Sequence, residues 1–161
     1  MTVHQRKYGP DDMQEITSPE QLEEVVVQRN LSLLYYALKH IHFNYKELYT
    51  YLNERLLGDL TVENSKAVIL GSLMEVSEST IYRWKNSMTP VKAAHADRLS
   101  HLIELYTYGV EVLGSEEAFK DWLNQPNIHF KSEAPITRLD SLAGIKLIRH
   151  LLDKIEYGAP V

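Results

Sequence analysis

Apolar residues recur at helical spacing along most of the chain and predict a protein built from helices. The first stripe, Leu22, Val26, Leu33 and Ala37, indicates a helix that starts at Ser18 and runs to about His42, unless it is interrupted near Asn30. Later stripes predict helices over 45–56, 61–75, 77–86, 90–113, 116–125 and 141–155. No segment alternates with period two for long enough to predict a strand, so the expected fold class is all-α.

Capping residues mark where these helices begin and end. The candidate N-caps are Ser18, Asn44, Ser77, Thr89, Ser115 and either Asp140 or Ser141, with proline directly after Ser18 and Thr89. Gly58 and Gly114 stand where glycine commonly ends a helix. The chain then divides into a polar, mobile arm (1–17), N-terminal helices suited to dimerisation (18–58), a middle region (59–114) and a C-terminal domain (115–161).

The stretch 66–90 has the pattern of a helix-turn-helix. Its apolar positions lock two short helices together, and they are Leu70, Met74, Val76, Ile81 and Trp84, with Gly71 between the first two. The second helix would lie in the major groove of DNA. The candidate DNA contacts are Ser79, Thr80, Tyr82, Arg83, Lys85, Asn86 and Lys92.

Arg83 is the best candidate to reach a guanine edge or a phosphate, and Lys85 and Lys92 are suited to phosphates. The alternative is that these side chains are solvated charges on a scaffold helix. Glu78 opposes phosphate contact, and its simpler interpretation is a charge favoured by the N-terminus of the helix.

The charge balance limits how the chain can bind nucleic acid. The net charge of −5 argues against a coat of phosphate contacts, but 66–98 carries five basic and three acidic residues. A small basic face on an acidic protein suits local groove binding.

Several other classes of function are excluded or disfavoured. The chain has no cysteine, which excludes disulfides, thiolate zinc sites and cysteine catalysis. No signal-peptide pattern or apolar run of 18 residues occurs, so a cytoplasmic protein is expected. The histidine pairs His40/His42 and His95/His101 lack metal-site spacing, and no phosphate loop or nucleophile motif occurs. We therefore expect no catalytic residues, metal or cofactor, and no enzymatic activity.

The C-terminal motifs resemble a known family. In chain order they are Phe119, Trp122-Leu123, Pro126-Asn127, Pro135-Ile136, Leu139, Gly144, Leu151-Leu152 and Lys154-Ile155-Glu156-Tyr157-Gly158. This order is similar to the toxin-binding domain of the Xre/MbcA/ParS antitoxin family. Upstream, Val76-Ser77-x-x-Thr80-Ile81-x-Arg83 followed by Thr89-Pro90 and Asp97-Arg98-Leu99 resembles the Xre-like half of those proteins.

The resemblance implies a type II antitoxin with an Xre/lambda-repressor-like helix-turn-helix followed by a small helical toxin-binding domain. It further implies a RES-domain toxin, resembling ADP-ribosyltransferases and attacking NAD, as partner. The antitoxin would cover the toxin's active site and, as a homodimer, repress its own operon. The chain departs from the family pattern in two places. Glu75 stands where a glycine is common before the turn of a helix-turn-helix, so the resemblance does not determine the geometry of the turn. Residues 130–134 stand where the family often has a glycine-rich segment, so the resemblance does not determine the shape of the loop that faces the toxin.

The tail is the best candidate for toxin contact, because a helix that ends in Tyr-Gly-Ala-Pro leaves a short segment able to enter a concave site. The candidate toxin-binding residues are Arg149, Lys154, Glu156, Tyr157, Gly158 and Val161. The alternative is a frayed terminus. For Phe119, Trp122 and Leu123, helical spacing favours a place in the core over toxin contact.

Two other functions fit the same pattern. One is a stand-alone transcriptional regulator whose C-terminal domain senses something other than a toxin. The other is an interaction adaptor whose helix-turn-helix has lost DNA binding, which the acidic balance allows.

Overall fold

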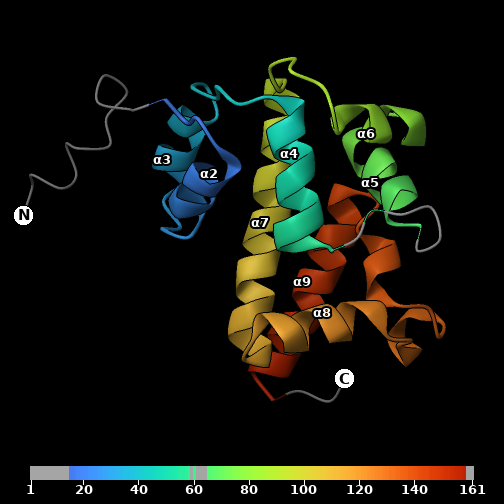
Figure 1. Ribbon diagram of the computed structural model, residues 1–161. Helices are drawn as coiled ribbons and strands as arrows, with labels where there is room; N and C mark the ends of the chain where they lie inside the picture. Colours follow the sequence, from blue (N-terminus) through green and yellow to red (C-terminus); the bar gives the residue numbers. More distant parts are fainter. Residues whose placement is uncertain (1–14, 59, 61–64, 159–161) are drawn as a thin grey trace, which may run out of the picture.

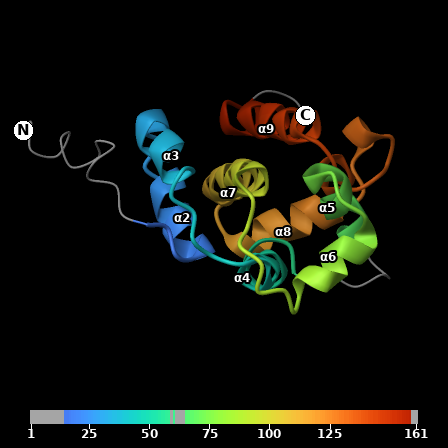
Figure 2. The ribbon, with the colours of Figure 1, turned by 90° about the horizontal axis from the view of Figure 1, so that it is seen from above.

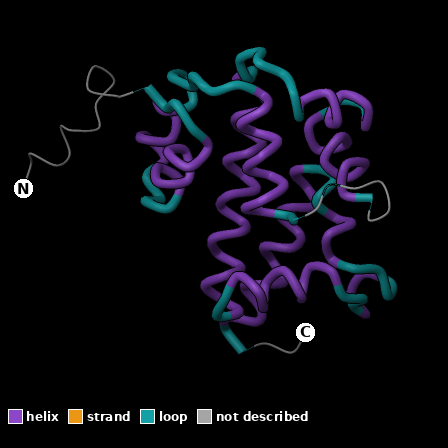
Figure 3. The backbone as a smooth tube through the Cα atoms, viewed as in Figure 1, coloured by secondary structure: helices purple, strands orange, loops and turns teal. Residues whose placement is uncertain are grey.

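The computed structural model describes residues 15–58, 60 and 65–158. These residues form helices and loops, with isolated bridges but no strand, which confirms the all-α fold class (Figures 1 and 3). The α-helices in chain order are α2 (Pro19–Val26), α3 (Leu31–Ala37), α4 (Tyr45–Tyr51), α5 (Lys66–Met74), α6 (Glu78–Trp84), α7 (Ala93–Leu113), α8 (Glu116–Asn124) and α9 (Leu142–Glu156). A π-helical turn η2 (Leu52–Leu56) and the short 3₁₀ helices η4 (Ile128–Phe130) and η5 (Pro135–Arg138) complete the fold.

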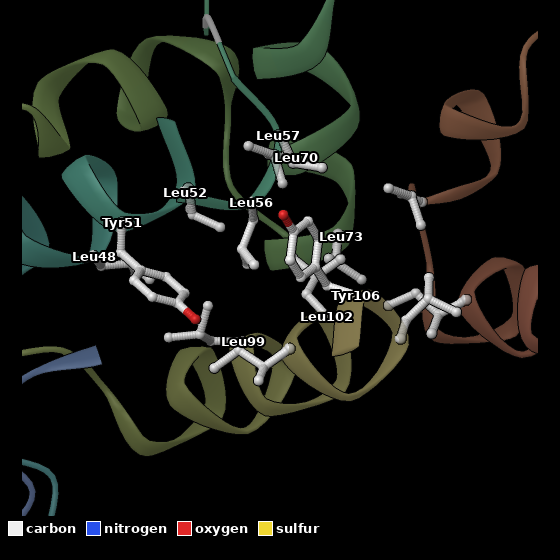
Figure 4. Close-up of a cluster of buried hydrophobic side chains, with 14 of the residues drawn as sticks. Leu48, Tyr51, Leu52, Leu56, Leu57, Leu70, Leu73, Leu99, Leu102 and Tyr106 are labelled. Atoms are coloured by element: carbon white, nitrogen blue, oxygen red, sulfur yellow. The ribbon is translucent and has the colours of Figure 1, made fainter. Parts of the chain in front are cut away.

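The long helix α7 is the centre of the molecule. Helices α2, α5, α8 and α9 all pack against it, and α4 lies alongside α2 and α6 (Figures 1 and 2). One cluster of buried apolar side chains runs through the described chain, from Ile16 to Leu152. Figure 4 shows part of this cluster, in which leucines of α4, η2 and α5 meet those of α7. Residues on both sides of Gly114 therefore share one core.

The expected helix from Ser18 to about His42 is two helices. Arg29 has φ 55°, which ends α2, and the side chain of Asn30 accepts a hydrogen bond from the Leu33 amide to begin α3. A left-handed residue cannot continue a right-handed helix, so the interruption near Asn30 is the correct alternative. Ile16, expected in the mobile arm, is buried and pairs with Ile41; residues 1–14 of that arm lie outside the described residues.

Two predicted helix starts are wrong. The long helix starts at Ala93, because the backbone of 89–91 pairs with 43–45: Thr89 accepts from the Tyr45 amide, and the Val91 amide donates to Phe43. The helix expected from Thr61 starts at Lys66; residues 61–64 lie outside the described residues.

The remaining predicted caps are confirmed. The hydroxyls of Ser18, Ser77, Ser115 and Ser141 each accept a hydrogen bond from the amide three residues later. Asn44 and Glu47 form a reciprocal capping box at the start of α4. None of the helices in the described ranges is long and apolar enough to cross a membrane.

Candidate functional site

Helices α5 and α6 are joined by the turn 75–77, at the place where the sequence predicts the helix-turn-helix. Glu75 has φ 58° and ψ 42°, the left-handed conformation that glycine usually supplies there. A Cβ added to Gly71 would lie 2.8 Å from the carbonyl oxygen of Val76. Gly71 thus allows the close approach of the turn to α5, and Glu75 makes the turn despite its side chain.

Two side chains of α7 form hydrogen bonds with the carbonyl groups at the C-terminal end of α5. The guanidinium of Arg98 donates to the Leu73 carbonyl at 2.7 Å and lies 3.4 Å from the Glu75 carboxylate. The ring of His95 bonds through Nε2 to the Met74 carbonyl at 3.1 Å. Two carbonyls that the end of a helix leaves without intrahelical partners are satisfied in this way.

Three aromatic rings hold α6 in place. Trp84 of α6 stacks on Tyr45 of α4, with ring centres 4.5 Å apart, and its ring centre lies 5.2 Å from that of His95. The Tyr45 hydroxyl is 2.7 Å from His95 Nδ1 and accepts from the Lys92 amide at 3.1 Å. These contacts fit a neutral imidazole with its proton on Nε2. Burial lowers the pKa of His95 below its ordinary value, mainly because a buried site disfavours the charged form.

The predicted DNA contacts lie on α6 and on the segment that follows it. Ser79, Arg83, Lys85, Asn86 and Lys92 are exposed, whereas Thr80 and Tyr82 are half-buried. The guanidinium of Arg83 donates to the Thr80 hydroxyl at 2.7 Å, along the outer side of the helix. Arg83, Lys85 and Lys92 are basic, whereas Glu75 in the turn and Glu78 at the start of α6 are acidic.

The predicted toxin contacts divide into two groups. Lys154, Glu156, Tyr157 and Gly158 are exposed at the end of α9, with Tyr157 82% exposed. Arg149 instead pairs with Glu104 of α7, and its guanidinium lies 3.8 Å from the centre of the Tyr108 ring. Val161 lies outside the described residues.

Other residues of the C-terminal motifs have structural roles. Phe119 and Leu123 are buried, which confirms their predicted place in the core, and Trp122 stacks half-buried against Phe119. A Cβ added to Gly144 would lie 1.7 Å from the Arg138 carbonyl, so α9 packs directly on η5. Several residues of the C-terminal motifs are therefore those through which α7, α8, η5 and α9 pack together.

Sequence reasoning missed the residues that position α6. The sequence places Tyr45 only at the start of a predicted helix, and His95 lacks the spacing of a metal ligand. Their contacts join residues 21 and 50 positions apart, which helical spacing cannot show. Among the described residues, no group of three or more His, Cys, Asp or Glu is placed to hold a metal ion.

Comparison with known proteins identifies the C-terminal region. The family model described as the antitoxin Xre/MbcA/ParS C-terminal toxin-binding domain matches residues 109–158. Comparison with the curated proteins and with the solved structures gave no significant match. The family match confirms the resemblance seen in the motifs and supports an antitoxin role. Residues 109–158 are therefore similar to the C-terminal toxin-binding domain of the Xre/MbcA/ParS antitoxin family.

Proposed function

We propose that this chain is an antitoxin that neutralises a RES-domain toxin and represses its own operon. Its C-terminal region covers the active site of the toxin, and α6 reads operator DNA. The chain itself performs no catalysis; its activity is binding. The observation that carries the proposal is the exposed end of α9 within the matched toxin-binding domain.

The end of α9 is built to enter a concave site. Tyr157 is 82% exposed and is followed by Gly158 with φ 73°, which turns the chain away from the helix. A tyrosine offers a large contact area and loses little side-chain entropy on binding. The carboxylate of Glu156 is suited to pair with basic groups that hold the phosphates of NAD in the toxin. Lys154, Gly158 and Val161 would contact the rim of the same site.

The exposed side of α6 is suited to the major groove. Arg83 is held by Thr80 in the free protein and would exchange that hydrogen bond for a base edge or a phosphate. Lys85 and Lys92 would contact phosphates, and Ser79, Tyr82 and Asn86 would contact bases or the backbone. A homodimer would supply the second recognition helix, since one helix reads few bases.

The two proposed surfaces are separate. Helix α6 and the end of α9 lie at different ends of the molecule in both views (Figures 1 and 2). An antitoxin arranged in this way can bind DNA and toxin at the same time, as autorepression by a toxin–antitoxin complex requires.

Two variants of the full chain test the proposal as a pair. Deletion of residues 157–161 should abolish neutralisation of the proposed RES-domain partner and leave operator binding unchanged. Arg83→Ala should weaken operator binding by about ten- to a hundredfold, equivalent to roughly 1–3 kcal/mol, and leave neutralisation unchanged. Toxin rescue in cells and gel shifts on the promoter of the gene pair measure the two effects.

Each variant is the control for the other. If the truncated chain still neutralises the toxin fully, the tail is not the inhibitory segment. If the wild-type chain gives no shift even at low salt, where phosphate contacts are strongest, it does not read the operator directly.

A further inference from the structure

A groove lies between the N-terminal helices and α9, with α7 as its floor. Its volume is about 590 Å³, within the roughly 300–1,000 Å³ of clefts that hold a ligand. Figure 2 shows α7 between α2–α3 on one side and α9 on the other. Arg149 of α9 and Ser100, His101 and Glu104 of α7 line the groove opposite α3.

The wall formed by α2 and α3 is apolar and exposes large side chains at its edge. Val26, Leu34 and Leu38 line it, together with Leu31 and Tyr35. Leu31 is 83% exposed and Tyr35 is 57% exposed. Tyr35 contacts its neighbours Tyr36 and Lys39 but stays more than half exposed. Exposed apolar side chains beside an apolar groove are typical of a binding surface.

Both arginines of the groove already have carboxylate partners within the chain. Arg29 pairs with Glu111, and Arg149 pairs with Glu104. An occupant that needs free basic side chains, such as a phosphate, is therefore disfavoured. The lining fits an apolar helix face or loop of a protein partner, laid between α3 and α9.

The position of the groove indicates which protein binds there. Arg149 of α9 lines the groove and belongs to the matched toxin-binding domain, so the groove borders that domain. It lies across α7 from α6 (Figure 2). A two-fold dimer formed through the groove would place its two α6 helices at the outer ends, which does not suit half-sites one DNA turn apart.

We propose that the toxin docks an apolar segment in this groove, so that α2 and α3 form part of the toxin interface. The inference rests on the proposed antitoxin function, but it adds a surface outside residues 109–158. The C-terminal tail inhibits the toxin, and the groove provides affinity and discrimination between toxins. Members of the family that share the C-terminal domain would then differ in partner through their N-terminal helices.

Leu31→Asp in the full chain tests this surface. Leu31 is the first residue of α3, where an acidic side chain is favoured by the helix dipole, so the variant should keep its fold. Val68→Asp is the matched control, because Val68 is 51% exposed in the first turn of α5 and does not line the groove. Isothermal titration with the proposed RES-domain partner should show binding about ten- to a hundredfold weaker for Leu31→Asp and nearly unchanged for Val68→Asp.

The outcomes separate this inference from the proposed function. If the wild-type chain does not bind the RES-domain protein, the proposed function fails and the inference fails with it. If the wild-type binds and Leu31→Asp binds as tightly as Val68→Asp, the groove is not the docking site, but the antitoxin function stands. If Leu31→Asp instead lowers self-association in sedimentation experiments and spares toxin binding, the groove belongs to a second copy, which also overturns the inference. Tyr35→Ala should reproduce the loss of affinity seen with Leu31→Asp.

Discussion

Glu75 shows how a single residue can adopt an unfavourable conformation without disrupting a turn. The left-handed conformation costs a non-glycine residue about 1–2 kcal/mol. The turn nevertheless forms, because Gly71 allows the Val76 amide to donate to the Gly71 carbonyl at 2.8 Å and Arg98 supports the Leu73 carbonyl at 2.7 Å. The conformation is imposed by the packing of α5, α6 and α7.

Glu75→Gly should therefore stabilise the protein by about 0.5–1 kcal/mol. Glycine removes the backbone strain, which stabilises the folded state, but it loses more conformational entropy on folding, which offsets part of that gain. The ion pair with Arg98 that is lost contributes little, because Glu75 is exposed. Urea denaturation measures the change in the free energy of unfolding. Glu75→Ala keeps the Cβ and loses the ion pair, so it should not stabilise. Equal gains from both variants would show that the carboxylate, rather than the backbone, is unfavourable.

At the scale of the element, α6 is positioned by side chains of other helices. It is a short helix, and helices of that length are not stable by themselves. Trp84 is fixed between Tyr45 of α4 and His95 of α7, and Ser77 caps the start. The direction of the proposed recognition helix thus depends on α4 and α7 as much as on its own sequence.

This arrangement predicts a loss of stability in acid. The pKa of His95 is lowered in the folded protein, so below its ordinary pKa of about 6.5 the unfolded chain binds more protons than the folded one. The free energy of unfolding should be constant with respect to this group above that pH and should decrease as the pH falls below it. Thermal melts between pH 5 and 8 measure the slope.

The contribution of His95 can be isolated with two variants. His95→Gln should reduce the slope, although it lowers stability at neutral pH. His101→Gln changes an exposed histidine on the same helix and should keep the slope. If both variants retain the full acid sensitivity, another group is responsible for it.

At the scale of the whole molecule, one arginine joins three parts of the chain. Arg55 of η2 pairs with Glu23 of α2 and Glu116 of α8, and its guanidinium lies 5.3 Å from the centre of the Tyr106 ring. The hydrogen bond to Arg55 lowers the pKa of Glu116, and burial raises that of Tyr106 to about 12. The network fixes the N-terminal helices, one wall of the groove, relative to the C-terminal domain.

Arg55→Met should destabilise the protein by about 1–2 kcal/mol. The arginine is 35% exposed, so the loss should lie between that of a surface pair and that of a buried pair. Denaturant unfolding of Arg55→Met, Glu23→Gln and the double variant measures the coupling. Additive effects would show that the pair contributes no interaction energy.

The sequence by itself determined the features that depend on near neighbours. Ser18, Ser77, Ser115 and Ser141 each cap a helix through the amide three residues later, and Phe119 and Leu123 were predicted to be core from helical spacing. The C-terminal motifs also indicated the family that residues 109–158 match, because their residues are needed for the packing of that region.

The tertiary structure decided the features that depend on residues distant in the chain. Local pattern favoured Thr89 as an N-cap, but the pairing of 89–91 with 43–45 moved the start of α7 to Ala93. Arg149, predicted from the sequence as a toxin contact, pairs with Glu104, 45 residues earlier. The groove beside Leu31 exists only because α3 and α9 lie on either side of α7. Capping and periodicity act within one or two helical turns, whereas these contacts depend on how whole helices pack.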